Sequence, residues 1–451
     1  MRSSVPKPLH AVAGIPMVSH VIRAATVVAP EQVVVVVGPE LADLPDRIGM
    51  AGMVTAAIQE RPQGTGDALR AALPATGNVE WLLVFFADHP RLDALTVERL
   101  LDGAMASRAK VTMLTTVIPG AVHYGRVDRD AEGRVVRVVE SKDDDPATRV
   151  GDVEINSGMM AIDAAWARAA LPHLSPSTAT GEFYLTELIE LAVSGSRRPD
   201  ETWPVATVTA DPHVALGIND RVELAAADAA IRHGIRERLM RSGVTLVGPE
   251  TIFIDADVTI GEDTTVMPFT VLTGATAIGR ECVIGPSTTI IGSEIGDRVA
   301  VRASTIEFCE VGSDSDCGPY AHLRAGTVLA SGVHVGNFAE IKNSALAEGV
   351  KVGHFSYLGD AQVGAQTNIG AGTVTANFDG VEKHRTEIGA EVFIGSDTIL
   401  RAPVVIGDGA RTGAGSVVTK DVKPGATVVG VPARQIASGK RTTAQNTEEG
   451  S

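Results

Sequence analysis

The sequence predicts an α/β domain followed by a parallel β-helix, and three observations support this fold class. Between residues 260 and 418, small aliphatic residues return at every sixth position, and glycine often follows them. Before about residue 215, apolar runs typical of buried strands alternate with helical stretches. A segment rich in Ala, Arg, Glu and Leu separates the two patterns. A period of six is neither helical nor strand-like, so it indicates stacked coils of short parallel strands.

The six-residue spacing also predicts which side chains face the interior of the β-helix. It runs through Ile260, Val266, Leu272, Ile278, Ile284 and Ile290, resumes at Cys317, Leu323, Leu329, Val335 and Ile341, and returns at Ile388, Leu400 and Ile406. Glycines beside these residues allow the tight corners between strands. The spacing breaks at residues 376–385, which are too polar to form a coil, so we expect this segment to loop out.

The first half of the chain shows the pattern of an α/β domain. Strands are predicted at residues 32–37, 82–86 and 111–117 and a helix at 95–106, an alternation typical of a largely parallel sheet. We assign residues 1–215 to this domain, 216–243 to a linker helix, 244–437 to the β-helix, and 438–451 to a polar tail that we expect to be disordered.

Composition excludes several classes of function. The 451 residues carry 39 Lys and Arg against 55 Asp and Glu, a net charge of −16, which argues against binding nucleic acid or an anionic membrane. No apolar run approaches the ~18 residues of a membrane span, and the chain does not begin with a signal-peptide stretch. Three cysteines, all within the repeat, argue against a disulfide framework. These features favour the reducing cytoplasm.

Residues 82–88 place a carboxylate at the end of a predicted strand. Open α/β sheets bind ligands at this edge, and Asp88 there can hold Mg²⁺ against a nucleotide phosphate. Taken alone, Asp88 also fits a helix cap or a loop. The sequence Gln63-Gly64-Thr65-Gly66 provides backbone N–H groups at the start of an apparent helix, which suits a phosphate or a base edge.

One histidine of the repeat is a candidate general base. His354 lies at a predicted coil corner, and Arg324 and Lys342 supply positive charge on nearby coils. Acyl transfer to an amine needs a base that titrates near neutral pH, as histidine does, and cations suit a phosphorylated acceptor. A solvated turn residue is the alternative. A zinc site needs three converging ligands, whereas His322, His334 and His354 occur singly.

Nearly the whole chain resembles the bacterial family of bifunctional N-acetylglucosamine-1-phosphate uridyltransferases/glucosamine-1-phosphate N-acetyltransferases, which combine a Rossmann-like nucleotidyltransferase domain with a left-handed β-helix of hexapeptide repeats. The motifs occur in the family's order. They are Val5-Pro6-Lys7, residues 59–66, Asp88, Tyr124-Gly125-Arg126, Val139-Glu140, residues 154–158, residues 181–184, Asn219-Asp220-Arg221 and the catalytic segment 353–360.

The resemblance implies a uridyl-transfer site in the first domain, with Mg²⁺ held by Asp88 and Asn219. The implied uridine and sugar pocket consists of Lys7, Gln59, Gly64, Thr65, Phe86, Asp88, Gly125, Glu140, Asn156 and Asn219. N-acetylglucosamine-1-phosphate would attack the α-phosphorus of UTP and release pyrophosphate, while the metal and Lys7 neutralise developing charge.

The resemblance implies an acetyl-transfer site in the β-helix, with His354 as its base. Glucosamine-1-phosphate would be bound by Arg324, Lys342, Tyr357, Asn368 and Lys383, and acetyl-coenzyme A by Ala371, Asn377, Phe378, Ser396 and Ala414. Phe378 stands where the family typically has tyrosine, so one hydroxyl hydrogen bond to the cofactor is lost. The β-helix is expected to form a homotrimer with coenzyme A clefts between subunits.

One departure from the family concerns the first domain. Members begin with a buried strand and a glycine-rich loop, whereas the printed chain starts at Met1, where the last residue of that motif would fall. For the chain as printed, we expect unpaired strand edges inside the sheet and impaired uridyl transfer. A start codon assigned too far downstream explains the missing strand and loop equally well. Ala87 stands where the family usually has glycine.

The sequence therefore predicts a bifunctional enzyme of UDP-N-acetylglucosamine biosynthesis. Two alternatives remain. One is another sugar-nucleotide pyrophosphorylase whose β-helix is a non-catalytic scaffold, against which His354, Lys342 and Arg324 argue. The other is a non-enzymatic assembly module, favoured only if neither substrate binds.

Overall fold

The computed structural model describes residues 1–120, 124–142, 144–145, 151–177, 180–195 and 202–436. They form two compact units, Met1–Ile231 and Arg232–Ser451, which are considered separately. The predicted disordered tail, residues 438–451, lies outside the described residues. Within the described part of the chain, no helix is both long and apolar enough to cross a membrane.

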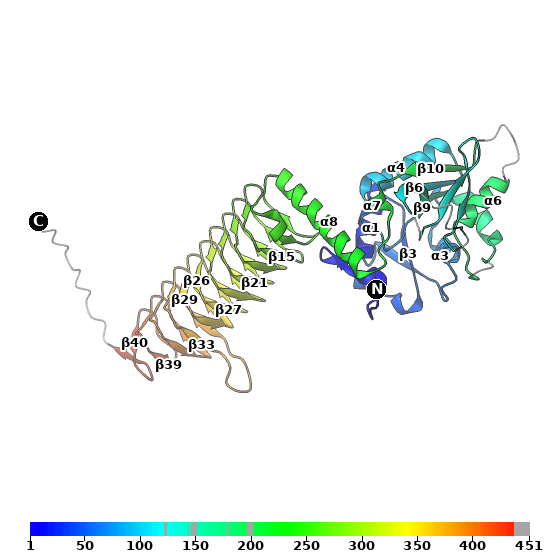
Figure 1. The fold of residues 1–451 in the computed structure, drawn as a ribbon. Helices are drawn as coiled ribbons and strands as arrows, with labels where there is room; N and C mark the ends of the chain where they lie inside the picture. The colour runs from blue at the N-terminus through cyan, green and yellow to red at the C-terminus, as the bar shows by residue number, and fades with distance from the viewer. Residues whose placement is uncertain (121–123, 143, 146–150, 178–179, 196–201, 437–451) are drawn as a thin grey trace, which may run out of the picture. The chain divides into compact units, whose positions relative to one another are not determined.

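The first unit packs helices against strands (Figure 1). Helix α3 contacts β3, α4 contacts β6 and β10, and α6 contacts β8. Its helices are α1 (Met17–Ala25), α2 (Leu44–Arg47), α3 (Thr65–Ala72), α4 (Ala94–Ser107), α5 (Ala164–Ala170), α6 (Glu187–Gly195) and α7 (Pro212–Ala215), and α8 (Arg221–Arg241) begins in this unit and ends in the second. The strands are β1 (Ala11–Val12), β2 (Ile15–Pro16), β3 (Val33–Val37), β4 (Val54–Ile58), β5 (Trp81–Val84), β6 (Val111–Pro119), β7 (Arg126–Arg129), β8 (Val135–Val139), β9 (Asp152–Asp163) and β10 (Val205–Thr209).

The larger sheet of this unit is mixed, so the prediction of a largely parallel sheet was wrong. Strand order is β10-β6-β9-β7-β8, with β5 also paired to β9. Strands β6 and β10 are parallel, as are β3 and β4, but β9 runs antiparallel to β5, β6 and β7. Parallel neighbours need a crossover connection, usually a helix. Among the described residues no helix lies between β6 and β9, and the chain reverses direction instead.

An apolar groove of about 630 Å³ separates β3 from β5. It is lined by residues 33–36 of β3, by residues 81–87 on and after β5, and by side chains of α1 and α3. In the described sheets, β3 pairs only with β4 and β5 only with β9, so each strand keeps one edge without a strand partner. This agrees with the expectation of unpaired strand edges inside the domain.

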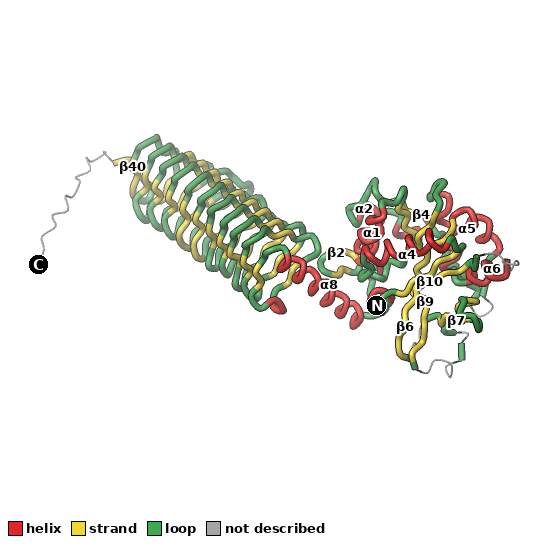
Figure 2. The backbone as a smooth tube through the Cα atoms, turned by 90° about the horizontal axis from the view of Figure 1, so that it is seen from above, coloured by secondary structure: helices red, strands yellow, loops and turns green. Residues whose placement is uncertain are grey.

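The second unit is a left-handed parallel β-helix with three faces, and Figure 2 shows its stacked coils. The first face contains β11 (Thr245–Leu246), β14 (Thr265–Val266), β17 (Val283–Ile284), β20 (Ala300–Val301), β23 (Asp316–Cys317), β26 (His334–Asn337), β29 (Lys351–His354), β32 (Asn368–Ile369), β35 (Phe393–Ile394), β38 (Arg411–Thr412), β40 (Thr427–Val429) and β41 (Arg434–Ile436). The second contains β12 (Phe253–Ile254), β15 (Val271–Thr273), β18 (Thr289–Ile291), β21 (Thr305–Glu307), β24 (His322–Arg324), β27 (Glu340–Lys342), β30 (Tyr357–Gly359), β33 (Val374–Ala376), β36 (Ile399–Arg401) and β39 (Val417–Val418). The third contains β13 (Thr259–Ile260), β16 (Ala277–Ile278), β19 (Glu294–Ile295), β22 (Glu310–Val311), β25 (Val328–Leu329), β28 (Ala345–Leu346), β31 (Ala361–Val363), β34 (Thr386–Ile388) and β37 (Val404–Ile406).

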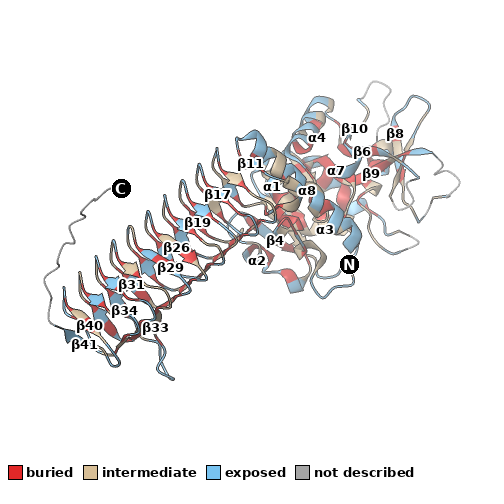
Figure 3. Ribbon diagram, turned by 60° about the vertical axis from the view of Figure 1, so that its left-hand side comes forward, coloured by how far each residue is buried: buried red, intermediate tan, exposed pale blue. Residues whose placement is uncertain are grey.

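The predicted aliphatic residues form the interior of the β-helix. Figure 3 shows buried and exposed positions alternating along its coils. Leu272, Ile290, Leu323 and Ile341 stack along the second face and are fully buried. Ile260, in the first coils, is only half-buried. All three cysteines are buried and unpaired. Small and medium-sized apolar side chains therefore stack on one another from coil to coil and exclude water from the interior.

The polar segment predicted to loop out leaves the coil stack between β33 and β34. Figure 1 shows this loop as an orange hairpin. A backbone bridge between Phe378 and Lys383 closes it, and Asp379 accepts hydrogen bonds from the backbone N–H groups of Val381 and Glu382. These bonds hold a structured hairpin at the edge of the second face.

Candidate active sites

Three side chains predicted for the uridyl-transfer site meet beyond the end of β5. Lys7 lies on a 3-10 turn (Lys7–Leu9), Asp88 follows β5, and Asn219 precedes α8. The Lys7 ammonium donates to Asp88 Oδ2 at 2.5 Å and to Asn219 Oδ1 at 3.1 Å. One carboxylate oxygen and one amide oxygen therefore face a common cation.

The Asp88 carboxyl is ionised at neutral pH. Burial alone would raise its pKa, but the hydrogen bond and charge of His89, followed by those of Lys7, outweigh burial and lower the pKa to about 2. Mg²⁺ prefers oxygen ligands and commonly takes one or two from the protein and the rest from phosphate and water. Asp88 and Asn219 fit this role. No group of three His, Cys, Asp or Glu residues in the described chain could hold a metal ion.

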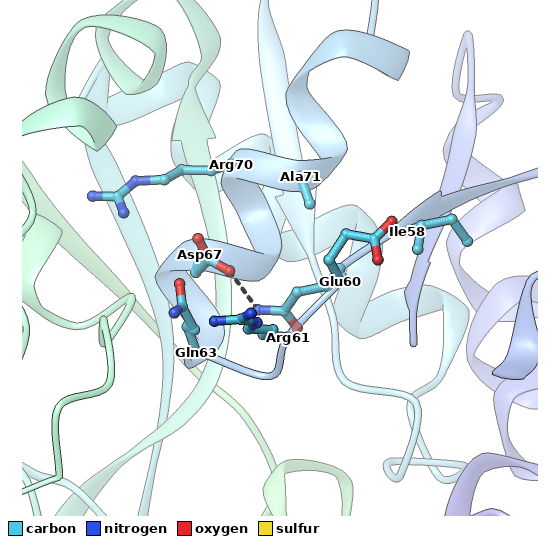
Figure 4. A pocket seen from close by; sticks show the side chains of 8 residues that line it. Ile58, Glu60, Arg61, Gln63, Asp67, Arg70 and Ala71 are labelled. Atoms are coloured by element: carbon cyan, nitrogen blue, oxygen red, sulfur yellow. Dashed lines mark hydrogen bonds between the residues drawn. The ribbon is translucent and has the colours of Figure 1, made fainter. Parts of the chain in front are cut away.

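Gln59 belongs to a second part of the site and follows the end of β4. Its side-chain amide donates to Asp67 Oδ2 at 2.8 Å, beside a groove of about 390 Å³ that Figure 4 shows in close-up. Gly64 precedes α3 with φ +103°, and a Cβ there would lie 2.5 Å from the carbonyl oxygen of Phe183. Only glycine suits this backbone conformation and contact. Helix α3 begins at Thr65, as the sequence predicted, and the backbone N–H of Gly66 donates to the carbonyl oxygen of Phe183 at 2.8 Å.

Residues 185 and 186 connect two further predicted positions. The Thr65 hydroxyl accepts a hydrogen bond from the backbone N–H of Leu185 at 3.0 Å. Glu140, which follows β8, accepts one from the Thr186 hydroxyl at 2.8 Å. The start of α3 and the end of β8 are thereby tied to one segment. Thr186 was not predicted.

The other predicted residues of this unit lie on and beside β9. The backbone N–H of Asn156 donates to the carbonyl oxygen of Gly125 at 2.8 Å, which sets these two residues side by side. The Phe86 ring lies against Gly158, where any side chain would clash with it. No described hydrogen bond joins these residues to Lys7 or Gln59.

His354 is exposed at the end of β29, on a corner of the β-helix. Its Nδ1 donates to Oδ1 of Asn337 at 2.6 Å, and the two residues are paired on successive coils. This bond leaves Nε2 free to accept a proton, which a general base requires. Asn337 was missed by sequence reasoning, although its position one coil before His354 is a signal that the repeat contains.

Three cationic side chains gather on the second face. Lys383 of the hairpin and Arg324 of β24 crowd the Lys342 ammonium, and together they lower the pKa of Lys342, Lys383 having the larger effect. The Arg324 guanidinium also donates to Glu340 at 2.7 Å. Tyr357, paired with Glu340 in register, lies within electrostatic reach of Arg324. Crowded cations favour an anionic ligand such as a phosphate.

Asp360 ties the hairpin to the coils and was also missed by sequence reasoning. Its two oxygens accept hydrogen bonds from the side-chain amides of Asn343, at 2.5 Å, and Asn377, at 2.6 Å. Burial opposes ionisation, but these two bonds and the charges of Lys383 and Lys342 lower its pKa. Asn377, predicted to contact acetyl-coenzyme A, is buried and holds Asp360 in this structure.

The residues predicted for acetyl-coenzyme A fall into two groups. The pairing of Lys351 with Asn368 places Ala371 one coil beyond His354 at the same corner. Backbone hydrogen bonds continue this column, from Asp397 to Ala371 and from Gly415 to Ser396, so Ala414 follows. Phe378 is exposed on the hairpin instead. Asn368 lies on the first face, apart from the cations of the second.

The fold and sites define a two-part transferase, a nucleotidyltransferase joined to a hexapeptide acyltransferase. A family model of MobA-like NTP transferase domains matches residues 1–127, and one of bacterial transferase hexapeptides (six repeats) matches 257–292 and 385–420. Proteins described as bifunctional protein GlmU are similar to the whole chain. Identity is 40% in Trichlorobacter lovleyi, over 94% of this chain and 91% of the relative. It is 42% in Heliobacterium modesticaldum, over 95% and 92%, and 40% in Mycobacterium tuberculosis, over 97% and 88%.

The chain belongs to the family of bifunctional GlmU proteins. It is an enzyme with acetyltransferase and uridyltransferase activities in UDP-N-acetylglucosamine synthesis, the bifunctional class that the sequence predicted. The impairment of uridyl transfer that we expect for the chain as printed stays a prediction. Membership supports this function over the two alternatives of a non-catalytic scaffold and an assembly module. The hexapeptide repeats are consistent with oligomerisation.

Proposed function

We propose that His354 is the general base that deprotonates the amine of glucosamine-1-phosphate as it attacks the thioester of acetyl-coenzyme A. The observation that carries this role is the 2.6 Å bond from His354 Nδ1 to Asn337, which orients the ring at an exposed corner. Coenzyme A thiolate leaves as the N–C bond forms, and the amine proton passes to Nε2.

The cations of the second face supply the acceptor's phosphate site. Lys342, Lys383 and Arg324 crowd one another, and this repulsion is relieved when a dianionic phosphate binds between them. Tyr357 lies beside them on the next coil. The column of Ala371, Ser396 and Ala414 beyond His354 presents small side chains along the corner, where an extended cofactor can lie.

The complete acetyl-transfer site forms between chains of a homotrimer. Asn368 lies on the first face and Lys342 on the second. A neighbour's first face packed near the second face would bring the two residues to one ligand. The rings of Tyr320 and Phe338 stack at 5.2 Å and, with Phe355, are exposed near the corner that carries His354, as residues of a subunit interface would be.

Uridyl transfer takes place in the first unit, with Asp88 and Asn219 holding Mg²⁺. The bound ion supplies charge neutralisation at the triphosphate. Lys7 then pairs with a phosphate oxygen, Gln59, Gly64 and Thr65 bind the uridine, and Gly125, Glu140, Asn156 and Phe86 bind the sugar. The functional domains are residues 1–215 and 244–437, joined by the linker 216–243.

Substitution of His354 tests the acetyl-transfer proposal. His354→Ala should lower the rate of coenzyme A release at least about 100-fold, the usual contribution of a general base. His334→Ala is a matched control on the preceding coil, because His334 pairs with Asp316 outside the site. Uridyl transfer should stay unchanged in both variants. If His354→Ala keeps more than about a tenth of the acetyl-transfer rate, His354 is not the base.

A further inference from the structure

His89, the residue after Asp88, is buried and makes a directed contact with that carboxylate. Its side chain is 7% exposed, and its Nδ1 lies 2.9 Å from Asp88 Oδ1. A backbone turn fixes the residue, because His89 donates to Phe86 and its carbonyl accepts from Leu92. The turn fixes the backbone of His89, and the bond to Asp88 orients its ring.

The two oxygens of Asp88 have different partners. Oδ1 accepts from His89, whereas Oδ2 faces the Lys7 ammonium at 2.5 Å, together with Asn219 Oδ1. Without the contact to His89, the Asp88 carboxylate could turn about its Cβ–Cγ bond and direct either oxygen at the Lys7 ammonium. The contact with His89 leaves Oδ2 as the oxygen directed at the cation.

The same ring also packs against the segment that carries the second oxygen donor. A Cβ at Gly217 would lie 2.9 Å from His89 Cε1, so a larger residue at 217 would displace the ring. Ile218 donates its backbone N–H to the carbonyl oxygen of Asp88 at 2.9 Å, and Asn219 follows directly. His89 thus contacts both chain segments that carry the oxygens facing Lys7.

The second ring nitrogen of His89, Nε2, does not explain why the ring is buried. His89 Nε2 is buried and has no hydrogen-bond partner among the described residues. The described hydrogen bond of the His89 ring is therefore the one to Asp88. A ring that donates to a ligating carboxylate and fixes its orientation accounts for one paired and one unpaired nitrogen.

We propose that His89 is a positioning residue of the uridyl-transfer site, which holds Asp88 Oδ1 so that Oδ2 and Asn219 Oδ1 face the divalent cation together. This inference rests on the proposed metal role of Asp88 and Asn219. His89 does not touch the cation or the substrates.

Binding of Mn²⁺ alone to the full chain, followed by electron paramagnetic resonance, tests the inference. His89→Leu should weaken Mn²⁺ binding about tenfold or more, the usual effect of losing such a partner. His89→Asn, whose amide can donate from the position of Nδ1, should stay within about threefold of the native Kd. The rate of acetyl transfer should be unchanged in both variants. This control shows that the β-helix is intact.

The outcomes distinguish the role of His89 from the proposed metal role of Asp88, on which it rests. If Asp88→Ala leaves Mn²⁺ binding unchanged, the metal role of Asp88 is wrong. If Asp88→Ala weakens binding but His89→Leu does not, the metal role stands and the role of His89 is overturned. If His89→Leu and His89→Asn weaken binding equally, the hydrogen bond is not what positions Asp88, and the inference fails. A lower melting temperature with native Mn²⁺ affinity in His89→Leu assigns His89 a structural role only.

Discussion

The two units of this protein assemble their sites in opposite ways. In the β-helix, residues that meet across stacked coils are one coil apart, as Asn337 and His354 are. In the first unit, Lys7 meets Asp88 across 81 residues and Asn219 across 212. A stacked repeat converts sequence spacing into spatial contact, whereas a mixed sheet brings together loops whose spacing carries no such information.

The units also differ in how completely their strands are paired. Each β-helix strand between the first and the last coils lies between neighbours above and below. In the first unit, β3 and β5 face an apolar groove of about 630 Å³ instead of each other. Unpaired edges and poorly filled apolar space lower local stability. The difference leads to four predictions, from the largest expected effect to the smallest.

Amide hydrogen exchange should separate the two units most clearly. We expect amides of β3 and β5 to exchange at least about a hundredfold faster than those of β24 and β27, because groove-side backbone opens without breaking a strand pair. The measurement is exchange followed by mass spectrometry of peptides covering both regions. Equal protection of the two regions would contradict the link between the groove and local stability. For the same reason, the first unit should melt at a lower temperature than the β-helix.

Truncation of core residues should have unequal effects in the two units. Ile341 is fully buried between stacked neighbours, so Ile341→Ala should lower the free energy of unfolding of the β-helix by about 2–5 kcal/mol. Leu82 lines the groove, so Leu82→Ala should destabilise the first unit less, because part of its surroundings is already open. Urea unfolding of each variant, with acetyl and uridyl transfer as reporters of the two units, tests this. A larger loss from Leu82→Ala would reverse the comparison.

Lys383 tests whether the hairpin serves the acceptor. Lys383→Ala should raise the KM for glucosamine-1-phosphate about tenfold, the order expected for one hydrogen bond to a charged group. The KM for acetyl-coenzyme A should change little, because Lys383 crowds Lys342 rather than the His354 column. Initial rates with each substrate varied in turn provide the measurement, and Lys383→Arg is the control that keeps the charge. Equal changes in both KM values would assign the hairpin another role.

Phe378 should give the smallest effect. Its ring is exposed on the hairpin and lacks the hydroxyl that the resemblance associates with the cofactor. Phe378→Tyr should lower the Kd for coenzyme A by no more than about tenfold, since a net hydrogen bond contributes about 0.5–1.5 kcal/mol. Isothermal titration calorimetry measures the change. An unchanged Kd would place Phe378 away from the cofactor.

The sequence by itself determined the β-helix, its buried columns and the hairpin that leaves it, because each coil repeats one local rule and its contacts lie at a fixed spacing. It also marked Asp88 and Gly64, whose positions at a strand end and a helix start are local features. Tertiary structure alone decided that β9 runs antiparallel to its neighbours and that Lys7 meets both Asp88 and Asn219. Those contacts depend on how distant segments pack, and packing follows from the whole set of competing burial and pairing choices rather than from any one stretch of sequence.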